Sequence, residues 1–145
     1  MKVVVLTVLA IFSSLAVVMA LAQPASREMK HRIVFEVTAD GAESWQSVLN
    51  NVENVRAALG ADQTEIAVVV HGGALGMLMT TNEAQSQRMK QLADGGVIFA
   101  ACRNTMKRKN VAPDQLLPLA KTVDSGVAEV VRKQEAGWSY IKSGS

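Results

Sequence analysis

From residue 31 onward, short runs of apolar residues alternate with longer segments in which apolar residues return every three or four positions. The short runs are rich in β-branched and aromatic residues and suit strands, whereas the longer segments suit helices with one apolar face. Strands are therefore predicted at 31–37, 65–71, 97–101 and 119–123, and helices at 44–59, 82–93, 103–109 and 126–136. Residues 138–141 are expected to add a fifth strand or to dock as a tail.

Two of the predicted strands, 65–71 and 97–101, are apolar on both faces. Strands of this kind are typical of a parallel sheet that helices cover on two sides. Together with the repeated strand–helix order, this pattern predicts the α/β class. The expected architecture is a three-layer α/β/α sandwich, doubly wound, around a mostly parallel sheet of four to five strands.

Polar residues at the predicted helix starts set the expected boundaries. Asn82 and Ser125 each stand immediately before a helix, where their side chains can accept a hydrogen bond from a free backbone N–H group. The last helix is expected to pack through an apolar face made of Val127, Val130 and Val131.

The first 22 residues have the features of an export signal. A positive charge at Lys2 precedes a long apolar run, and the run ends in a small-x-small site at residues 20–22, which predicts cleavage before Gln23. An uncleaved membrane anchor is the alternative, because about 20 apolar residues can span a bilayer. Residues 1–22 are thus predicted to be a signal peptide, 23–30 a flexible leader and 31–145 one domain. The protein is expected to be exported or periplasmic, and to meet a membrane only during export or through an uncleaved anchor.

Composition narrows the range of partners. The 145 residues include 15 Lys and Arg against 13 Asp and Glu, so the formal net charge is only +2. Such a balance argues against binding nucleic acid through bulk charge. A single cysteine excludes an internal disulfide, so the fold must be held by its hydrophobic core.

Reactive side-chain types follow the predicted strands. In a parallel sheet the loops after the strands emerge at one edge, and ligands bind at that edge. These loops carry Asp40, His71 with Gly72 and Gly73, Cys102 with Asn104, and Asp124 with Ser125.

Cys102 is the strongest candidate for chemistry. A thiol immediately before a helix is close to unpaired N–H groups and to the positive end of the helix dipole, both of which favour the thiolate. Arg103 adds a positive charge, so a pKa below that of a free thiol is expected. Burial as a small apolar residue is the alternative, since free cysteine is among the most buried residue types.

His71 can approach Cys102 if their strands are neighbours, and could then act as a base or as a cation that lowers the thiol pKa. A structural histidine that binds loop carbonyls is the commoner case. No metal site is expected, because His31 lies at the opposite edge of the sheet and too few ligands remain. The loop at 72–76 lacks the spacing of a dinucleotide or nucleotide site, so no cofactor is expected; its glycines would let a ligand or a partner chain approach the backbone.

Four stretches of the chain, "HRIVFEVT", "NNVENVRAALG", "IAVVVHGGAL" and "VIFAACRNTM", together with the ending "SGVAEVVRKQEAGWSYIK", resemble the small single-domain branch of the DsrE/DsrF-like family. The resemblance implies an α/β/α sandwich of flavodoxin-like appearance and assembly into homotrimers or hexamers. It also implies a cysteine after the third strand that carries sulfur as a persulfide, and Cys102 matches that position. His71 and Asn104 match further positions of this branch.

The leading hypothesis is a sulfur carrier in which Cys102 accepts sulfane sulfur and passes it to a thiol-bearing acceptor protein, with His71 and Asn104 as further site residues. Export departs from the family, whose sulfur relays are usually cytoplasmic. The first alternative is a non-catalytic oligomeric module that binds a small ligand or a partner and buries its cysteine. The second is a redox sensor that forms mixed disulfides through an exposed Cys102.

Overall fold

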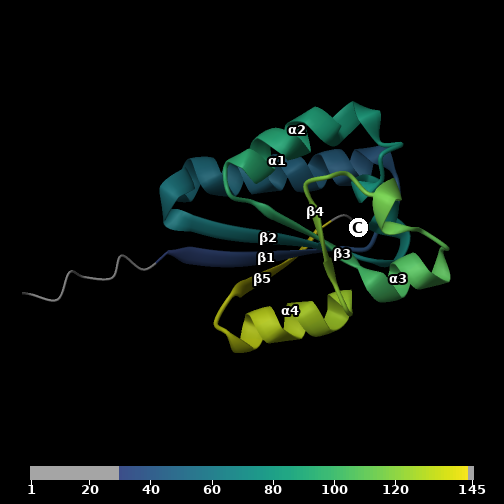
Figure 1. The fold of residues 1–145 in the computed structure, drawn as a ribbon. Coiled ribbons are helices and arrows are strands. Elements are labelled where there is room, and N and C mark those ends of the chain that lie inside the picture. Colours follow the sequence, from purple (N-terminus) through teal and green to yellow (C-terminus); the bar gives the residue numbers. More distant parts are fainter. Residues whose placement is uncertain (1–29, 144–145) are drawn as a thin grey trace, which may run out of the picture.

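Residues 30–143 are described by a computed structural model, and they form an α/β fold (Figure 1). The five strands are β1 (His31–Val37), β2 (Thr64–Val70), β3 (Ile98–Cys102), β4 (Ala120–Val123) and β5 (Ser139–Ser143). The α-helices are α1 (Ala42–Leu59), α2 (Glu83–Asp94), α3 (Arg103–Arg108) and α4 (Gly126–Glu135). Three short 3-10 helices complete the order: η1 (Ala61–Gln63), η2 (Gly72–Leu78) and η3 (Pro113–Gln115).

The predicted signal peptide, residues 1–22, and nearly all of the predicted leader lie outside the described residues. Within residues 30–143, no helix combines the length and the apolar character that crossing a membrane requires.

All five strands are parallel, and their order in the sheet is β4-β3-β2-β1-β5. The predicted α/β class and parallel sheet are therefore confirmed, and residues 138–141 belong mostly to a true fifth strand rather than a docked tail. Strands β1 to β4 follow one another across the sheet, whereas the connection through α4 returns to the far side of β1. This return places α4 on the opposite face from α1 and α2 (Figure 1).

Two separate apolar clusters fill the space above and below the sheet. The larger cluster joins one face of the strands to α1, α2 and η2, with Phe35 and Phe99 fully buried at its centre. The smaller cluster lies on the α4 face and contains Val34, Val69 and Val130. Because side chains alternate along each strand, the even positions of β1 and the odd positions of β2 point to α4.

Most predicted boundaries agree with the structure, and one of the two predicted helix caps is confirmed. Ser125 caps α4 by accepting a hydrogen bond from the N–H of Ala128 at 3.4 Å. Asn82 stands at the start of α2 without capping it, because its side-chain amide donates instead to the carbonyl of Met77 and to Gln85.

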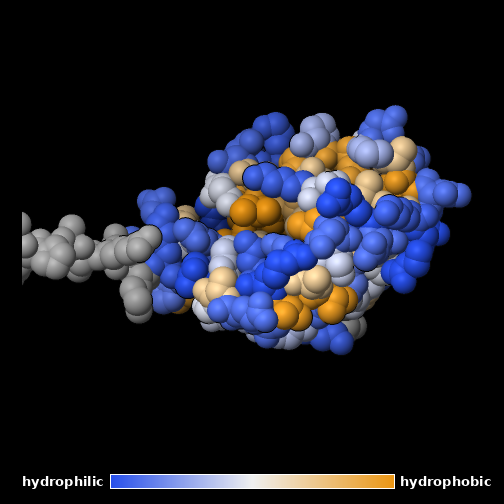
Figure 2. Space-filling view, turned by 60° about the horizontal axis from the view of Figure 1, so that its bottom comes forward, coloured by the Kyte–Doolittle hydropathy of each residue, from blue (hydrophilic) through white to orange (hydrophobic). Residues whose placement is uncertain are grey.

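The predicted apolar face of α4 is also wrong in part. Val130 is buried, whereas Val127 and Val131 are 57 % and 46 % exposed. Of these three valines, Val130 is the one that belongs to the apolar cluster on this face of the sheet. The α4 side of the molecule, turned forward in Figure 2, shows apolar patches set between hydrophilic areas.

The glycine-bearing segment at 72–78 is a buried 3-10 helix rather than an open loop. Its glycines are approached by the chain itself: a Cβ at Gly76 would lie 2.9 Å from the ring of Trp45. The sequence suggested that these glycines let a ligand or a partner chain approach the backbone. In the structure, the protein's own β1–α1 segment packs against Gly73 and Gly76.

Candidate functional site

Four side chains form a row on the face of the sheet that α4 covers, from the carboxyl edge at Cys102 and His71 to Tyr140 near the start of β5. They come from strands that lie side by side: Cys102 from β3, His71 directly after β2, Glu36 from β1 and Tyr140 from β5. Strand alternation puts all four on one face, since Cys102 shares a side with Ala100. Val70 pairs with Ala101 in the sheet, so the next residues, His71 and Cys102, are neighbours across two strands.

The sulfur of Cys102 lies among hydrogen-bond donors. Burial raises the pKa of its thiol, but hydrogen bonds from the backbone N–H groups of Gly126, Thr105 and Asn104 and from the Thr105 hydroxyl lower it. The hydrogen bonds have the larger combined effect, so the pKa of Cys102 falls below its usual value. Two chain segments supply the N–H groups: the first turn of α3 and the first residue of α4. The thiolate is therefore easier to form than in a free cysteine, although the residue is only 4 % exposed.

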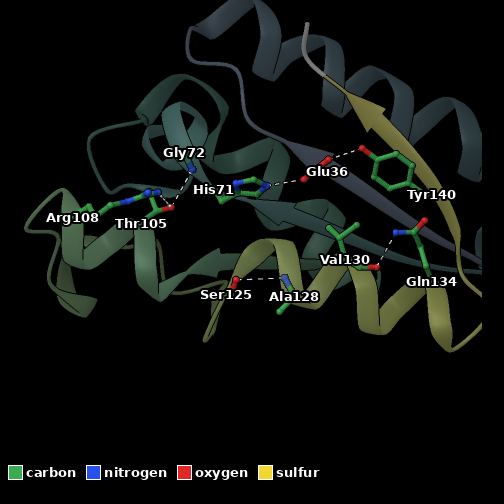
Figure 3. Close-up of polar contacts among 10 residues, drawn as sticks. All are labelled: Glu36, His71, Gly72, Thr105, Arg108, Ser125, Ala128, Val130, Gln134 and Tyr140. Carbon is green, nitrogen blue, oxygen red and sulfur yellow. Dashed lines mark hydrogen bonds and ion pairs between the residues drawn. The ribbon is translucent and has the colours of Figure 1, made fainter.

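Two donors hold the Thr105 hydroxyl, which also lowers the pKa of Cys102. Its oxygen accepts a hydrogen bond from the N–H of Gly72 at 3.1 Å and contacts the guanidinium of Arg108 at 3.4 Å (Figure 3). A hydroxyl oxygen has two acceptor positions and one proton. With both acceptor positions used, the proton remains for the Cys102 sulfur.

His71 binds Glu36 rather than Cys102. Its Nε2 lies 2.8 Å from Oε1 of Glu36, and the hydroxyl of Tyr140 donates to the other carboxylate oxygen (Figure 3). Burial raises the pKa of Glu36, but the hydrogen bonds from Tyr140 and His71 outweigh it, and the pKa is lowered. The same carboxylate raises the pKa of Tyr140 to about 12.

Gly126 packs against the His71 side chain, and its N–H group acts on the Cys102 thiol. A Cβ at Gly126 would lie 2.9 Å from Cβ and Cδ2 of His71, which is closer than side chains approach. Only glycine therefore lets α4 begin here, where its N–H reaches the sulfur of Cys102. His71 thus helps to determine where that N–H group lies.

Of the other predicted site residues, Asn104 contacts the site through its backbone, whereas Asp124 and Asp40 use their carboxylates elsewhere. The backbone N–H of Asn104 donates to the carbonyl of Asp124 at 3.3 Å and also lowers the pKa of Cys102, whereas Asn104 itself is exposed. The carboxylate of Asp124 binds Arg132 on the surface, and Asp40 accepts a hydrogen bond from the N–H of Gly41. Neither carboxylate joins the row.

Sequence reasoning missed Glu36, Thr105, Gly126 and Tyr140. Glu36 offered the only signal, because a charged residue within an otherwise apolar strand needs a partner when it is buried. The partners come from β2 and β5, whose positions beside β1 depend on strand order.

The described residues offer no group of three His, Cys, Asp or Glu side chains that could hold a metal ion. A shallow pocket of about 400 Å³ lies beside α3 and is lined mainly by Arg103, Met106, Lys107 and Val111, but Cys102 does not line it.

The fold and the site define a class: a parallel α/β sandwich that presents one thiol to N–H donors at the carboxyl edge of its sheet. Residues 25–143 match the model of the DsrE/DsrF-like family, and the chain belongs to that family. No curated protein matches.

Two solved structures are similar to this chain. The first is a protein of unknown function, MTH1491 from Methanobacterium thermoautotrophicum, with 32 % identity and a TM-score of 0.73 over 78 % of this chain and 99 % of that one. The second is the ychN protein from E. coli, with 11 % identity and a TM-score of 0.65 over 79 % of this chain and 99 % of that one. The second likeness concerns the fold alone.

Proposed function

We propose that this protein is a carrier of sulfane sulfur, with Cys102 as the residue that accepts the sulfur and passes it on. Membership of the DsrE/DsrF-like family supports a role in sulfur relay. The acceptor would be a thiol of another protein, so the partner is expected to be thiol-bearing.

The proposed reaction is thiolate exchange at a sulfur atom. The Cys102 thiolate attacks the outer sulfur of a persulfide R–S–SH, the S–S bond breaks, and R–S⁻ leaves with the bonding pair. Cys102 becomes Cys–S–SH, and a thiolate of the acceptor then removes the outer sulfur in the same way. No net oxidation or reduction takes place, because one S–S bond forms for each one that breaks.

One observation carries this proposal: the backbone N–H groups of Gly126, Thr105 and Asn104 and the Thr105 hydroxyl lower the pKa of Cys102 by more than burial raises it. A cysteine that served only to fill the core would need no such donors. Exchange proceeds best when the attacking thiol has a pKa near the ambient pH, and these donors move Cys102 in that direction. The adjoining residues Arg103, Asn104 and Asp124 are exposed, so reagents would approach from the carboxyl edge.

Intact mass spectrometry after incubation with polysulfide tests the proposal. The mature protein should gain one or more sulfur atoms that dithiothreitol removes, and the Cys102→Ser variant should gain none. A wild-type protein that gains no sulfur, or an equal gain in both proteins, would defeat it.

A second candidate, favoured by the 4 % exposure of Cys102, is a non-catalytic binding module in which the cysteine is buried. Alkylation separates the two candidates. A Cys102 that reacts with iodoacetamide only after denaturation supports the module, whereas fast reaction of the folded protein, with a midpoint below that of a free thiol, supports the carrier.

Assembly and export form part of the proposal. We expect a homotrimer or hexamer, and the exposed Val127 and Val131 of α4 are consistent with such self-association. Sedimentation equilibrium of residues 23–145 should give a mass of three or six chains; a monomer would contradict it. We also expect export with cleavage before Gln23. N-terminal analysis of the periplasmic protein would show Gln23 as its first residue, and an intact Met1 in the membrane fraction would show an anchor instead.

A further inference from the structure

We propose that three side chains on the α4 face of the sheet determine where the first N–H group of α4 meets the Cys102 thiol. This supporting cluster consists of Tyr140, Glu36 and His71. The inference rests on the proposed function, because it concerns the same thiol. All three are positioning residues, since they act on the thiol only through the backbone of Gly126, the first residue of α4.

The start of α4 lies beside Cys102 in the sheet. Cys102 pairs with Val123 at the end of β4, and the N–H of Asn104 donates to the carbonyl of Asp124 at 3.3 Å. Burial raises the pKa of the Cys102 thiol, and the N–H of Gly126 has the largest of the effects that lower it. Glycine has no side chain to anchor it, so the position of this N–H depends on what packs against the backbone.

His71 provides that packing. The three atoms nearest to a Cβ placed on Gly126 all belong to His71, with Cβ and Cδ2 at 2.9 Å and Cγ at 3.0 Å. Approaches this short leave no free space between the ring and the start of the helix. A ring that turned about its side-chain bonds would therefore either displace Gly126 or leave a gap beside it.

The ring of His71 is oriented by Glu36. The backbone of His71 is fixed separately, because its N–H donates to the carbonyl of Val37 at 3.1 Å and its carbonyl accepts from the N–H of Ala74 at 3.3 Å. The ring is bound through Nε2, which lies 2.8 Å from Oε1 of Glu36 (Figure 3). Within residues 30–143 the ring makes no other hydrogen bond. Loss of Glu36 would therefore free the ring while the end of β2 stays in place.

Tyr140 holds Glu36 from the other side. Its hydroxyl donates to Oε2 of Glu36, and the pairing of β5 with β1 places Lys142 opposite the same residue. Burial raises the pKa of Glu36, but its two hydrogen bonds and the charge of Lys142 outweigh that effect. Glu36 is thus a carboxylate that accepts a hydrogen bond at each oxygen, one from each neighbour.

The charge of Glu36 would act on Cys102 in the opposite direction from its role in the supporting cluster. Glu36 lies on β1 and Cys102 on β3, two strand spacings or about 10 Å apart. A carboxylate disfavours a second negative charge, so its removal alone would lower the pKa of the thiol. Loss of the support would raise that pKa, because the N–H of Gly126 would no longer be held at the thiol. The sign of the change separates the two effects.

Carbon NMR of Cys102 as a function of pH tests the proposal. The chemical shift of its Cβ reports ionisation of the thiol and does not depend on whether a reagent can reach it. Glu36→Leu can form neither hydrogen bond and should raise the pKa of Cys102 by about one unit, the lower end for loss of one hydrogen bond to a charged group. Glu36→Gln should cause a smaller rise, because its amide can accept from Tyr140 and donate to the ring of His71.

The N–H of Gly126 is followed in the same samples. In the wild type its amide proton should shift with the midpoint of Cys102, and in Glu36→Leu this shift should be smaller. Tyr140→Phe loses a single hydrogen bond at the surface, so it should change both signals in the same direction by less, and it serves if Glu36→Leu does not fold. Glu65→Gln removes an exposed carboxylate at the start of β2 and should leave both signals unchanged.

Three results would overturn the proposal: a pKa of Cys102 that falls or stays the same in Glu36→Leu and Tyr140→Phe, an equal rise in Glu65→Gln, or a wild-type Gly126 amide proton that does not respond when Cys102 ionises. Wild-type protein that shows the expected NMR shifts but gains no sulfur from polysulfide would instead defeat the proposed function, and the role of the supporting cluster would stand.

Discussion

Replacing Thr105 with valine should raise the pKa of Cys102 while nearly preserving the shape of the side chain. Thr105 is 1 % exposed, and its hydroxyl is one of the four donors that lower the pKa of the thiol. Valine cannot donate, so the thiolate loses a hydrogen bond.

The size of the effect follows from the kind of bond. A hydrogen bond to a charged group contributes about 1.5 to 3 kcal/mol, and one pKa unit corresponds to about 1.4 kcal/mol. The pKa of Cys102 should therefore rise by about one to two units. The valine also leaves the N–H of Gly72 without its acceptor, which costs about 1 to 3 kcal/mol of stability.

The assay is the rate of alkylation by iodoacetamide as a function of pH. The midpoint of the Thr105→Val profile should lie above that of the wild type, and the rate at pH 7 should fall about tenfold or more. Thr105→Ser is the matched control, because it keeps the hydroxyl and loses only a methyl group, so its midpoint should stay near that of the wild type. A folded Thr105→Val protein with an unchanged midpoint, or an equal shift in Thr105→Ser, would refute the reasoning.

Three further predictions follow from the same contacts. Gly126→Ala should destabilise the protein by about 1 to 3 kcal/mol and slow alkylation of Cys102, because the new methyl group would lie 2.9 Å from His71 and shift the start of α4. Thermal unfolding measures the loss of stability. Gly95→Ala is the control and should be nearly neutral, because its methyl group meets only the flexible end of Arg56. Ultraviolet titration should place the pKa of Tyr140 at about 12, and Glu36→Gln should return it toward 10.0, whereas an unchanged value in that variant would show that Glu36 is not the cause. Folding lowers the pKa of Cys102, so the stability of the wild type relative to Cys102→Ala should rise with pH as the thiol ionises and level off above about pH 8.5. Denaturant unfolding at several pH values measures the free energy of unfolding of both proteins. A difference between them that does not change with pH would contradict the lowered pKa.

Local patterns were sufficient for most of the secondary structure. The apolar run at 65–71 differs from the observed β2 by one residue at each end, because a strand buried on both faces has few sequence alternatives. Ser125 was recognised as a cap because its role depends only on the next three residues. Asn82 was misjudged because its amide is drawn to the carbonyl of Met77, which the tertiary structure brings near.

The candidate site was predictable only in part, for the same reason. The positions of Cys102 and His71 at strand ends were readable, since parallel strands end at one edge. The partners that define their chemistry were not. Thr105 binds the N–H of Gly72 because α3 packs against η2, and Glu36 reaches His71 because β1 lies beside β2.

The sequence by itself determined the class of fold, the run of strands and helices, and the edge at which a single thiol would stand, because these depend on apolar periodicity and chain direction. The tertiary structure alone decided strand order, and with it which side chains meet. Return of the chain through α4 to the far side of β1 puts Tyr140 next to Glu36 and the N–H of Gly126 next to Cys102. Hydrogen bonds act over a few ångströms of space, so a residue distant in the chain, Gly126, joins the neighbouring Asn104 and Thr105 in lowering the pKa of that thiol.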